Sequence, residues 1–274
     1  MFFPISDENP SQNKPLITYI LIGFCIFFFI LQYLSQMNIE IFLEFGFVPS
    51  NFFNTSPSLE SYFPIISSMF LHGGLAHIAG NMLYLWIFGD NVEDAMGRTR
   101  FIIFYFLCGI IAALAQGLVD PTSNIPMVGA SGAIAGVLGA YLMLYPRANV
   151  KCLLFIIIIF QMIRVPAFVV LGFWIFGQFF SAPFSLDAEG GTAYFAHIGG
   201  FLAGMILIPF FKRNEVNLFN SKVSSSWTVF ETKDNIYKSK NNFLDEFIRN
   251  SEDEIRKRKP VSYTHLTLPT RFSV

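Results

Sequence analysis

The chain has 274 residues, of which 53% are hydrophobic and only 14% are charged, and its formal net charge is -1. So apolar a composition excludes an ordinary water-soluble domain and favours a membrane protein that crosses the bilayer several times. The balanced charge gives no positive indication of a nucleic-acid partner, and we expect none.

The first 15 residues contain acids and prolines but lack the basic start of a cleaved signal peptide, so we expect a cytoplasmic N-terminal segment at 1–15. Each membrane crossing needs about 20 mostly apolar residues. Segments that meet this requirement lie near 16–34, 68–89, 101–119, 127–145, 165–183 and 192–211. The run at 153–160 is too short to cross alone, and we expect it to be interfacial or buried in protein. The sequence thus predicts an all-α polytopic membrane protein built as a six-transmembrane-helix bundle.

Lysine and arginine are distributed unevenly among the segments between these helices. The segments near 35–67, 120–126 and 184–191 contain neither residue but hold six acids. The other helix ends are flanked by basic residues: Lys14, Arg98, Arg100, Arg147, Lys151, Arg164, Lys212 and Arg213. Because basic residues favour the cytoplasmic side, we expect both termini to be cytoplasmic, in a bacterial cytoplasmic (inner) membrane.

Polar and charged residues replace the apolar runs after Phe211. We expect 212–260 to form a polar cytoplasmic tail, whose charges are a solvated face. The last stretch, 261–274, resembles translated vector sequence, and we expect it to be a non-native or artefactual tail. Function is therefore expected in a domain that covers 16–211.

Few polar side chains fall inside the predicted spans, and such groups indicate function unless a neighbour satisfies them. At about 1.5 Å per residue, Ser131, His197 and His77 lie roughly 20–24 Å from the inner ends of their helices. Since the bilayer core is about 30 Å thick, the three reach similar depths below the outer face. Asn81 follows His77 by four residues and shares its helix face. Three helices thus bring polar groups to one level.

Small residues recur at four-residue steps on two predicted helices. The first face holds Gly129, Gly132, Gly136 and Ala140, and the second holds Ala196, Gly200 and Gly204. Such faces let two membrane helices approach closely. We therefore expect Ser131 and His197 to come within hydrogen-bond distance.

A serine beside a histidine suits nucleophilic catalysis, because the imidazole can take the hydroxyl proton. Taken singly, Ser131 and His197 could each be packing residues, and His77 with Asn81 could be an interhelical polar contact. No acid lies at the depth of His197 in any predicted span, so we expect a dyad without an orienting carboxylate. The histidines are poorly phased for zinc and lack an HExxH motif, so we expect no metal and no cofactor.

Three motifs together carry a family resemblance: His72-x4-His77-x3-Asn81, Gly129-Ala-Ser131-Gly132 and Ala196-His197-Ile-Gly-Gly200. Over roughly 1–211 the chain resembles the rhomboid intramembrane serine proteases. The resemblance implies that Ser131 is the nucleophile and His197 the general base. It also implies an oxyanion hole made by Asn81, His77 and the backbone N–H of Ser131.

The same resemblance implies roles for parts outside the catalytic pair. Glu93 would be a structural acid bonded to a neighbouring loop, 35–67 a membrane-embedded outer loop, and 165–183 a movable lateral gate. Two positions depart from the family pattern. Phe63 and Pro64 stand where some members have Trp-Arg, and Ala135 stands where many have a tyrosine stacked on the histidine. The orientation of His197 is therefore unexplained by the sequence.

The expected function is that of a serine endopeptidase that cleaves single-span membrane proteins near the outer leaflet. Its cavity must admit water, and we expect His72 and Gln178 to help line it. The alternative is a non-proteolytic rhomboid-like binder or quality-control factor. A small transporter or channel is disfavoured because no charged residue falls at the midplane of a predicted span. Neither the substrate nor the oligomeric state is indicated.

Overall fold

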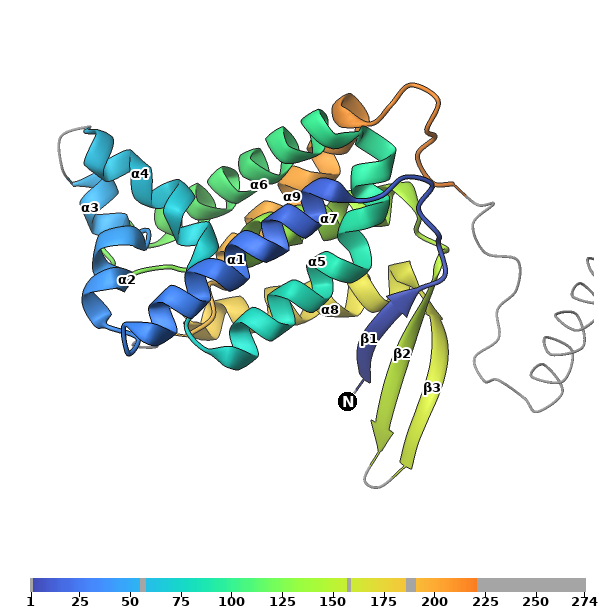
Figure 1. The fold of residues 1–274 in the computed structure, drawn as a ribbon, viewed down its shortest axis with the longest axis horizontal. Helices are drawn as coiled ribbons and strands as arrows, with labels where there is room; N and C mark the ends of the chain where they lie inside the picture. The colour runs from blue at the N-terminus through green and yellow to red at the C-terminus, as the bar shows by residue number, and fades with distance from the viewer. Residues whose placement is uncertain (1, 55–57, 157–158, 186–190, 221–274) are drawn as a thin grey trace, which may run out of the picture. The chain divides into compact units, whose positions relative to one another are not determined.

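A computed structural model describes residues 2–54, 58–156, 159–185 and 191–220 (Figure 1). The expected tail beyond 220 and the stretch 261–274 lie outside these residues. The long helices are α1 (Leu16–Leu34), α5 (Leu75–Met96), α6 (Arg98–Val119), α7 (Ser131–Leu144), α8 (Ala167–Ser181) and α9 (Tyr194–Phe211). Short helices join α1 to α5: α2 (Ile39–Phe45), α3 (Pro49–Phe53), α4 (Leu59–Ser67) and the 3-10 turn η1 (Ser68–Phe70).

The predicted helical membrane bundle is confirmed. Within the described residues, four helices are long and apolar enough to cross a membrane: α1, α6, α9, and α8 extended to Ser185 by the 3-10 turn η2 (Ala182–Ser185). Helix α7 is apolar but has only 14 residues, and α5 carries three acids near its C-terminus. The count of six crossings therefore stays a prediction.

Helices α5 and α7 begin four or more residues later than predicted. Helix α5 starts at Leu75 because Gly73 and Gly74 interrupt the segment after η1. Helix α7 starts at Ser131, since Met127 forms an isolated bridge with Phe47 before the helix can begin. Both shifts place the polar residues of the motifs at or near helix starts.

A three-stranded antiparallel sheet was not predicted. It consists of β1 (Phe2–Asp7), β2 (Asn149–Ile156) and β3 (Ile159–Pro166), in that order. The run at 153–160, expected to be interfacial or buried, forms much of this hairpin, with 157–158 outside the described residues. Glu8 anchors the sheet's base through Arg164 at 2.7 Å and Lys151 at 3.4 Å. The β-branched isoleucines of the run favour strands.

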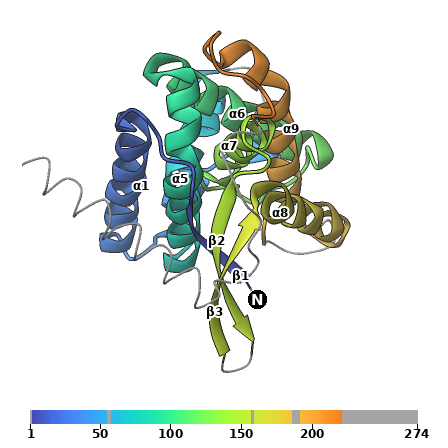
Figure 2. The ribbon, with the colours of Figure 1, turned by 90° about the vertical axis from the view of Figure 1, so that its right-hand side faces the viewer.

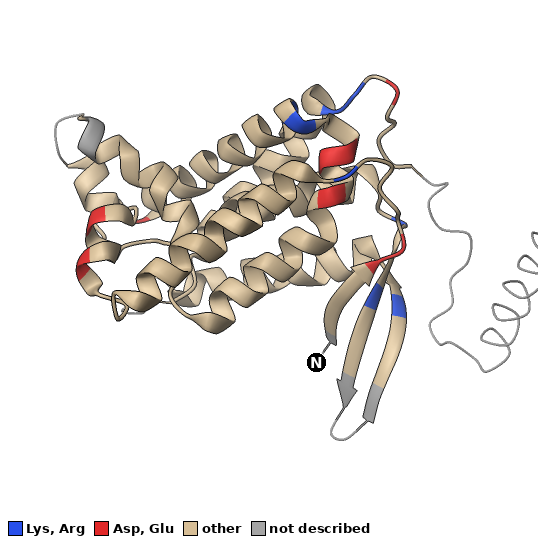
Figure 3. Cartoon of the chain, in the orientation of Figure 1, with Lys and Arg blue, Asp and Glu red and all other residues tan. Residues whose placement is uncertain are grey.

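The described charges gather at the two ends of the helices (Figure 3). Every described lysine and arginine lies at the end from which the sheet projects, and the middle of the bundle carries none. Apolar side chains on α1, α8 and α9 remain exposed, among them Phe27, Phe173 and Phe210. An apolar belt between charged ends is the pattern of a protein that sits in a bilayer.

Helix α7 lies at the centre of the bundle and packs against α5, α6 and α9, with α1 and α8 on opposite outer sides (Figure 2). Its contact with α9 depends on glycine. A Cβ at Gly200 would overlap the carbonyl of Gly132, and a Cβ at Gly204 would lie 2.6 Å from the carbonyl carbon of Gly136. The two backbones therefore touch where the small-residue faces meet.

Gly204→Val should lower the free energy of unfolding by about 1–3 kcal/mol, because the added side chain must push α9 away from α7. Thermal unfolding in detergent micelles measures the effect. Gly23→Ala is the matched control, since a Cβ there meets nothing within 4 Å. Equal melting temperatures for Gly204→Val and the wild type would contradict the close contact.

Glu93 supplies a cap that helix α1 lacks in its own sequence. The N-cap of α1 is Pro15, which makes no capping hydrogen bond through its side chain. The buried carboxylate of Glu93 instead accepts from Ile17 N at 3.0 Å, Thr18 N at 2.8 Å and Thr18 Oγ1 at 2.9 Å. An anion at a helix N-terminus is stabilised by the free N–H groups there. The partner of Glu93 is thus a helix start, where a loop was expected.

Asp7, at the end of β1, joins the sheet to the bundle. Its carboxylate accepts from Tyr141 Oη at 2.6 Å and from Asn91 Nδ2 at 3.1 Å. Burial raises the pKa of Asp7 from 3.8 to about 7, a shift opposed by the Tyr141 hydrogen bond and assisted by the negative charge of Asp90. Because the folded-state pKa is the higher one, ionised Asp7 destabilises the fold increasingly as the pH rises from about 4 to 7.

Asp7→Asn should therefore gain stability relative to the wild type between pH 5 and pH 8. Asparagine keeps an acceptor for Tyr141 but has no proton to lose. Melting temperatures measured across this range test the expectation, with Glu40→Gln on the exposed surface of α2 as the control. A constant difference between Asp7→Asn and the wild type would show that Asp7 does not titrate there.

Candidate active site

Ser131 is the first residue of α7, and the backbone before it is shaped by Gly129. Gly129 has a φ of +126°, which side-chain-bearing residues rarely adopt, and its N–H donates to Ser68 O at 2.8 Å. A Cβ at Gly129 would also lie 2.8 Å from Nε2 of His77. Gly129 therefore belongs to a tight loop, whereas the sequence analysis placed it on a helix face. This loop sets Ser131 where the first N–H groups of a helix lack intrahelical acceptors.

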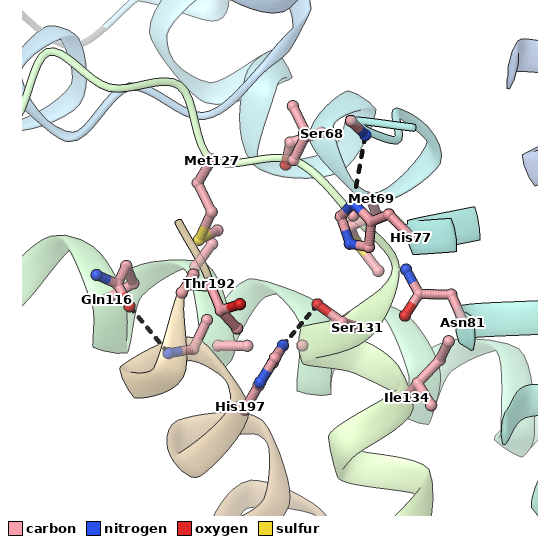
Figure 4. Close-up of a pocket in the computed structure, with 18 of the residues that line it drawn as sticks. Ser68, Met69, His77, Asn81, Gln116, Met127, Ser131, Ile134, Thr192 and His197 are labelled. Atoms are coloured by element: carbon pink, nitrogen blue, oxygen red, sulfur yellow. Dashed lines mark hydrogen bonds between the residues drawn. The ribbon is translucent and has the colours of Figure 1, made fainter. Parts of the chain in front are cut away.

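Ser131 and His197 come together from α7 and α9. Ser131 Oγ and His197 Nε2 are 2.8 Å apart, and His197 is buried (Figure 4). The closeness follows from two backbone contacts, Gly200 with Gly132 and Gly204 with Gly136, which lie about one and two turns after His197 on α9. A hydroxyl in hydrogen-bond contact with an imidazole is the arrangement that activates a serine nucleophile.

The far side of the imidazole contacts α8. His197 Nδ1 is 2.7 Å from Gln178 Oε1, and the Trp174 ring lies 5.7 Å from the imidazole, centroid to centroid, at an interplanar angle of 37°. Ala135 is fully buried and offers no aromatic ring. Neither contact with the imidazole was predicted from the sequence. The available signal was the four-residue spacing of Trp174 and Gln178, which places them on one helix face.

His77 and Asn81 lie on α5 and point into the same space (Figure 4). His77 Nδ1 accepts a hydrogen bond from Gly73 N at 3.2 Å. In a neutral imidazole the proton must then be on Nε2, which lies beside Gly129. Asn81 is buried, and its Nδ2 has no hydrogen-bond partner among the described residues. Two unused side-chain donors therefore face the region of Ser131.

These four residues line a cavity of about 680 Å³. Gly129 and Gly132 also contribute to its wall, as do Gln116 of α6 and Trp174 of α8. Gln116 Oε1 accepts from Ala196 N at 3.2 Å, which ties α6 to the start of α9. The cavity is partly polar, as chemistry that needs water below the membrane surface requires.

The remaining predicted site residues lie outside the cavity wall. His72, expected to line the cavity, is fully buried outside it, where its backbone N–H donates to Gln32 Oε1 at 3.0 Å. Gln178 reaches the site only through His197. Gly136, Gly200 and Gly204 form the helix contact, and Glu93 caps α1. Within the described residues, no group of three or more His, Cys, Asp or Glu side chains could hold a metal ion.

Comparison with known proteins yields one family. The model of the rhomboid domain matches residues 59–214. The chain is 34% identical over 134 residues to "Rhomboid protease GluP" of Bacillus subtilis, a match that covers 48% of this chain and 25% of that protein. It is 32% identical over 158 residues to "Rhomboid protein 1, mitochondrial" of Saccharomyces cerevisiae, covering 54% of this chain and 41% of the relative.

A third relative is "Presenilin-associated rhomboid-like protein, mitochondrial" of Homo sapiens, 30% identical over 155 residues, with 54% of this chain and 37% of that protein covered. The matched region spans less than half the length of each of these relatives. The family match extends over more than half of this chain and includes every residue of the cavity described above except Pro49. The chain is an integral membrane protein and belongs to the rhomboid family.

Proposed function

We propose that this protein is an intramembrane serine endopeptidase that cleaves single-span membrane proteins with Ser131 as nucleophile and His197 as general base. One observation carries the proposal: Ser131 Oγ and His197 Nε2 are 2.8 Å apart at a cavity in an otherwise apolar bundle. The relative from B. subtilis, which is named a rhomboid protease, supports the reaction class. The protease domain is proposed to cover 16–211.

The reaction proceeds by acyl transfer. Ser131 Oγ attacks the scissile carbonyl carbon while His197 Nε2 takes the hydroxyl proton. When the tetrahedral intermediate collapses, the C–N bond breaks and the imidazolium gives its proton to the leaving amine. A water molecule, deprotonated by His197, then hydrolyses the acyl ester and restores the serine. No cofactor is required.

Three donors are proposed to hold the oxyanion: Asn81 Nδ2, His77 Nε2 and the backbone N–H of Ser131. The first is a buried donor without a partner among the described residues, and the second carries a proton because His77 Nδ1 is an acceptor. The third belongs to the first turn of α7, where the helix dipole favours negative charge. Donors that are fixed before the reaction stabilise the transition state without reorganisation.

The substrate is proposed to enter beside α8. The outward face of this helix carries large exposed rings, including Phe173, Phe176 and Phe180, and so offers an apolar surface to another membrane segment. A substrate helix must unwind locally before its backbone can reach Ser131, and extended backbone is costly in lipid. Small or helix-breaking residues near the outer leaflet would lower this cost.

We further propose that both termini are cytoplasmic and that the site opens toward the exterior of a bacterial inner membrane. Support for the orientation comes from the described lysines and arginines, which lie at the sheet end of the bundle (Figure 3). The cavity wall includes Asp120, Ser123 and Thr192, from segments next to the helix ends opposite the sheet.

The test is to reconstitute the purified protein in liposomes with a panel of single-span substrates and to map any cut by mass spectrometry. We expect cleavage close to the outer leaflet, with a free carboxylate on the N-terminal product. Intact substrates in the presence of folded wild-type protein would overturn the proposal. Stable capture of an uncut substrate would instead favour a non-proteolytic binder.

A further inference from the structure

We infer that Gln178 is a positioning residue that determines which nitrogen of His197 carries the proton, so that α8 helps prepare the general base. The inference rests on the proposed function and concerns a residue that the reaction scheme above does not use. The orientation of the Gln178 amide selects the tautomer of the imidazole, and the packing of α8 holds the amide in place.

The orientation of the Gln178 amide is fixed by its own helix. Gln178 Nε2 donates to the backbone carbonyl of Trp174 at 3.3 Å. A carbonyl can only accept, so the atom facing Trp174 O must be the amide nitrogen. The amide oxygen then faces His197 Nδ1 at 2.7 Å. The reversed orientation would set two acceptors against each other at Trp174 O.

The orientation of the Gln178 amide fixes which nitrogen of His197 carries the proton. An amide oxygen only accepts, so His197 Nδ1 must carry the proton in this contact. The neutral imidazole then has its lone pair on Nε2, which accepts the hydroxyl proton of Ser131 across 2.8 Å. This is the tautomer that a general base needs, and a second hydrogen-bond partner is what selects it. Gln178 therefore supplies the orientation that a carboxylate provides in a three-residue catalytic site, without its charge.

Trp174 is a second residue of α8 that contacts the imidazole of His197. It lies four residues before Gln178, on the same face of α8, and its ring lies against both His197 and Phe201. Ala167, Val170 and Leu171 at the start of α8 are buried, but open space lies beside the rest of the helix: Cβ atoms added at Gly172 or Gly177 would meet nothing within 4 Å. A displacement of α8 by an entering substrate would thus move both partners of the imidazole together.

The decisive variants are Gln178→Leu and Gln178→Met, which keep the approximate size and suit an apolar helix but remove the acceptor. We expect kcat to fall at least about 10- to 100-fold, by analogy with the loss seen when the outer hydrogen-bond partner of a metal-binding histidine is removed. KM should stay within about twofold because Gln178 contacts the imidazole and not the substrate. Val169→Leu, at an exposed position on α8, is the matched control.

Gln178→Glu tests the role through the pH dependence of kcat/KM, which would not change if Gln178 were only a structural residue. A carboxylate next to Nδ1 favours the imidazolium, so the acid limb of the kcat/KM profile should shift to higher pH while activity exceeds that of Gln178→Leu. The other titratable groups on the cavity wall, His77 from α5, Tyr84 from α5 and Asp120 after α6, are unchanged in all variants.

Wild-type protein that cleaves no substrate would defeat the proposed function itself. Active wild type, with Gln178→Leu and Gln178→Met equal to it in kcat and pH profile, would overturn the role of Gln178 alone. Melting temperatures of all variants establish that each is folded, and the rate at which a fluorophosphonate labels Ser131 should fall in parallel with kcat.

Discussion

Ser131→Ala and His197→Ala should each reduce cleavage of a single-span substrate by at least about 10³-fold, to the background of the assay. Alanine at 131 removes the atom that forms the acyl-enzyme, and alanine at 197 removes the proton acceptor 2.8 Å from it. Groups that act as one unit are strongly non-additive, so the double variant should be no slower than either single variant. Product formation followed by mass spectrometry measures all three.

Ser35→Ala, in the exposed turn after α1, is the matched control and should retain full activity. The variants at 131 and 197 should also remain folded in thermal unfolding, because both side chains line the cavity and neither belongs to the hydrophobic core. Residual cleavage above about 1% in folded Ser131→Ala would show that another nucleophile performs the reaction.

Asn81→Leu should lower kcat by about 10²- to 10³-fold, the loss usual for one oxyanion donor. The same substitution should leave the melting temperature unchanged or raise it. Asn81 Nδ2 is buried and without a partner among the described residues, and removing an unpaired buried donor relieves a desolvation cost. Kinetics and thermal unfolding on one preparation measure both effects.

Opposite directions for activity and stability distinguish the proposed role from a structural one. If Asn81 instead held α5 to its neighbours by a hydrogen bond, Asn81→Leu would lower stability and activity together. His77→Phe should show a similar fall in kcat, since phenylalanine retains the ring but has no N–H beside Gly129. Unchanged kcat in both variants would remove these side chains from the oxyanion hole.

The sequence predicted the parts of the site that depend on helical periodicity. Glycine at four-residue steps indicated that α7 and α9 approach closely, and the structure places Gly200 against Gly132 and Gly204 against Gly136. The depths of the polar residues, counted from a constant rise per residue, stay a prediction. These features are local and repeat along one helix, so they can be recognised in a linear pattern.

Long-range contacts that no helical pattern marks were not predicted. Strand β1 pairs with β2, more than 140 residues away, and apolar alternation cannot reveal such a partner when the run LLFIIIIF is apolar throughout. The contact of Gln178 with His197 also joins two separate helices. The family pattern places an aromatic neighbour of His197 at position 135 on α7, whereas here that neighbour is Trp174 on α8.

The central claim is that Ser131 is activated by His197. The most direct measurement is the site and rate of fluorophosphonate labelling, determined by peptide mass spectrometry on the wild type and on His197→Ala. The account predicts a single adduct, on Ser131, that forms at least 100-fold faster in the wild type. An adduct on a different residue, or equal labelling rates in the two proteins, would contradict it.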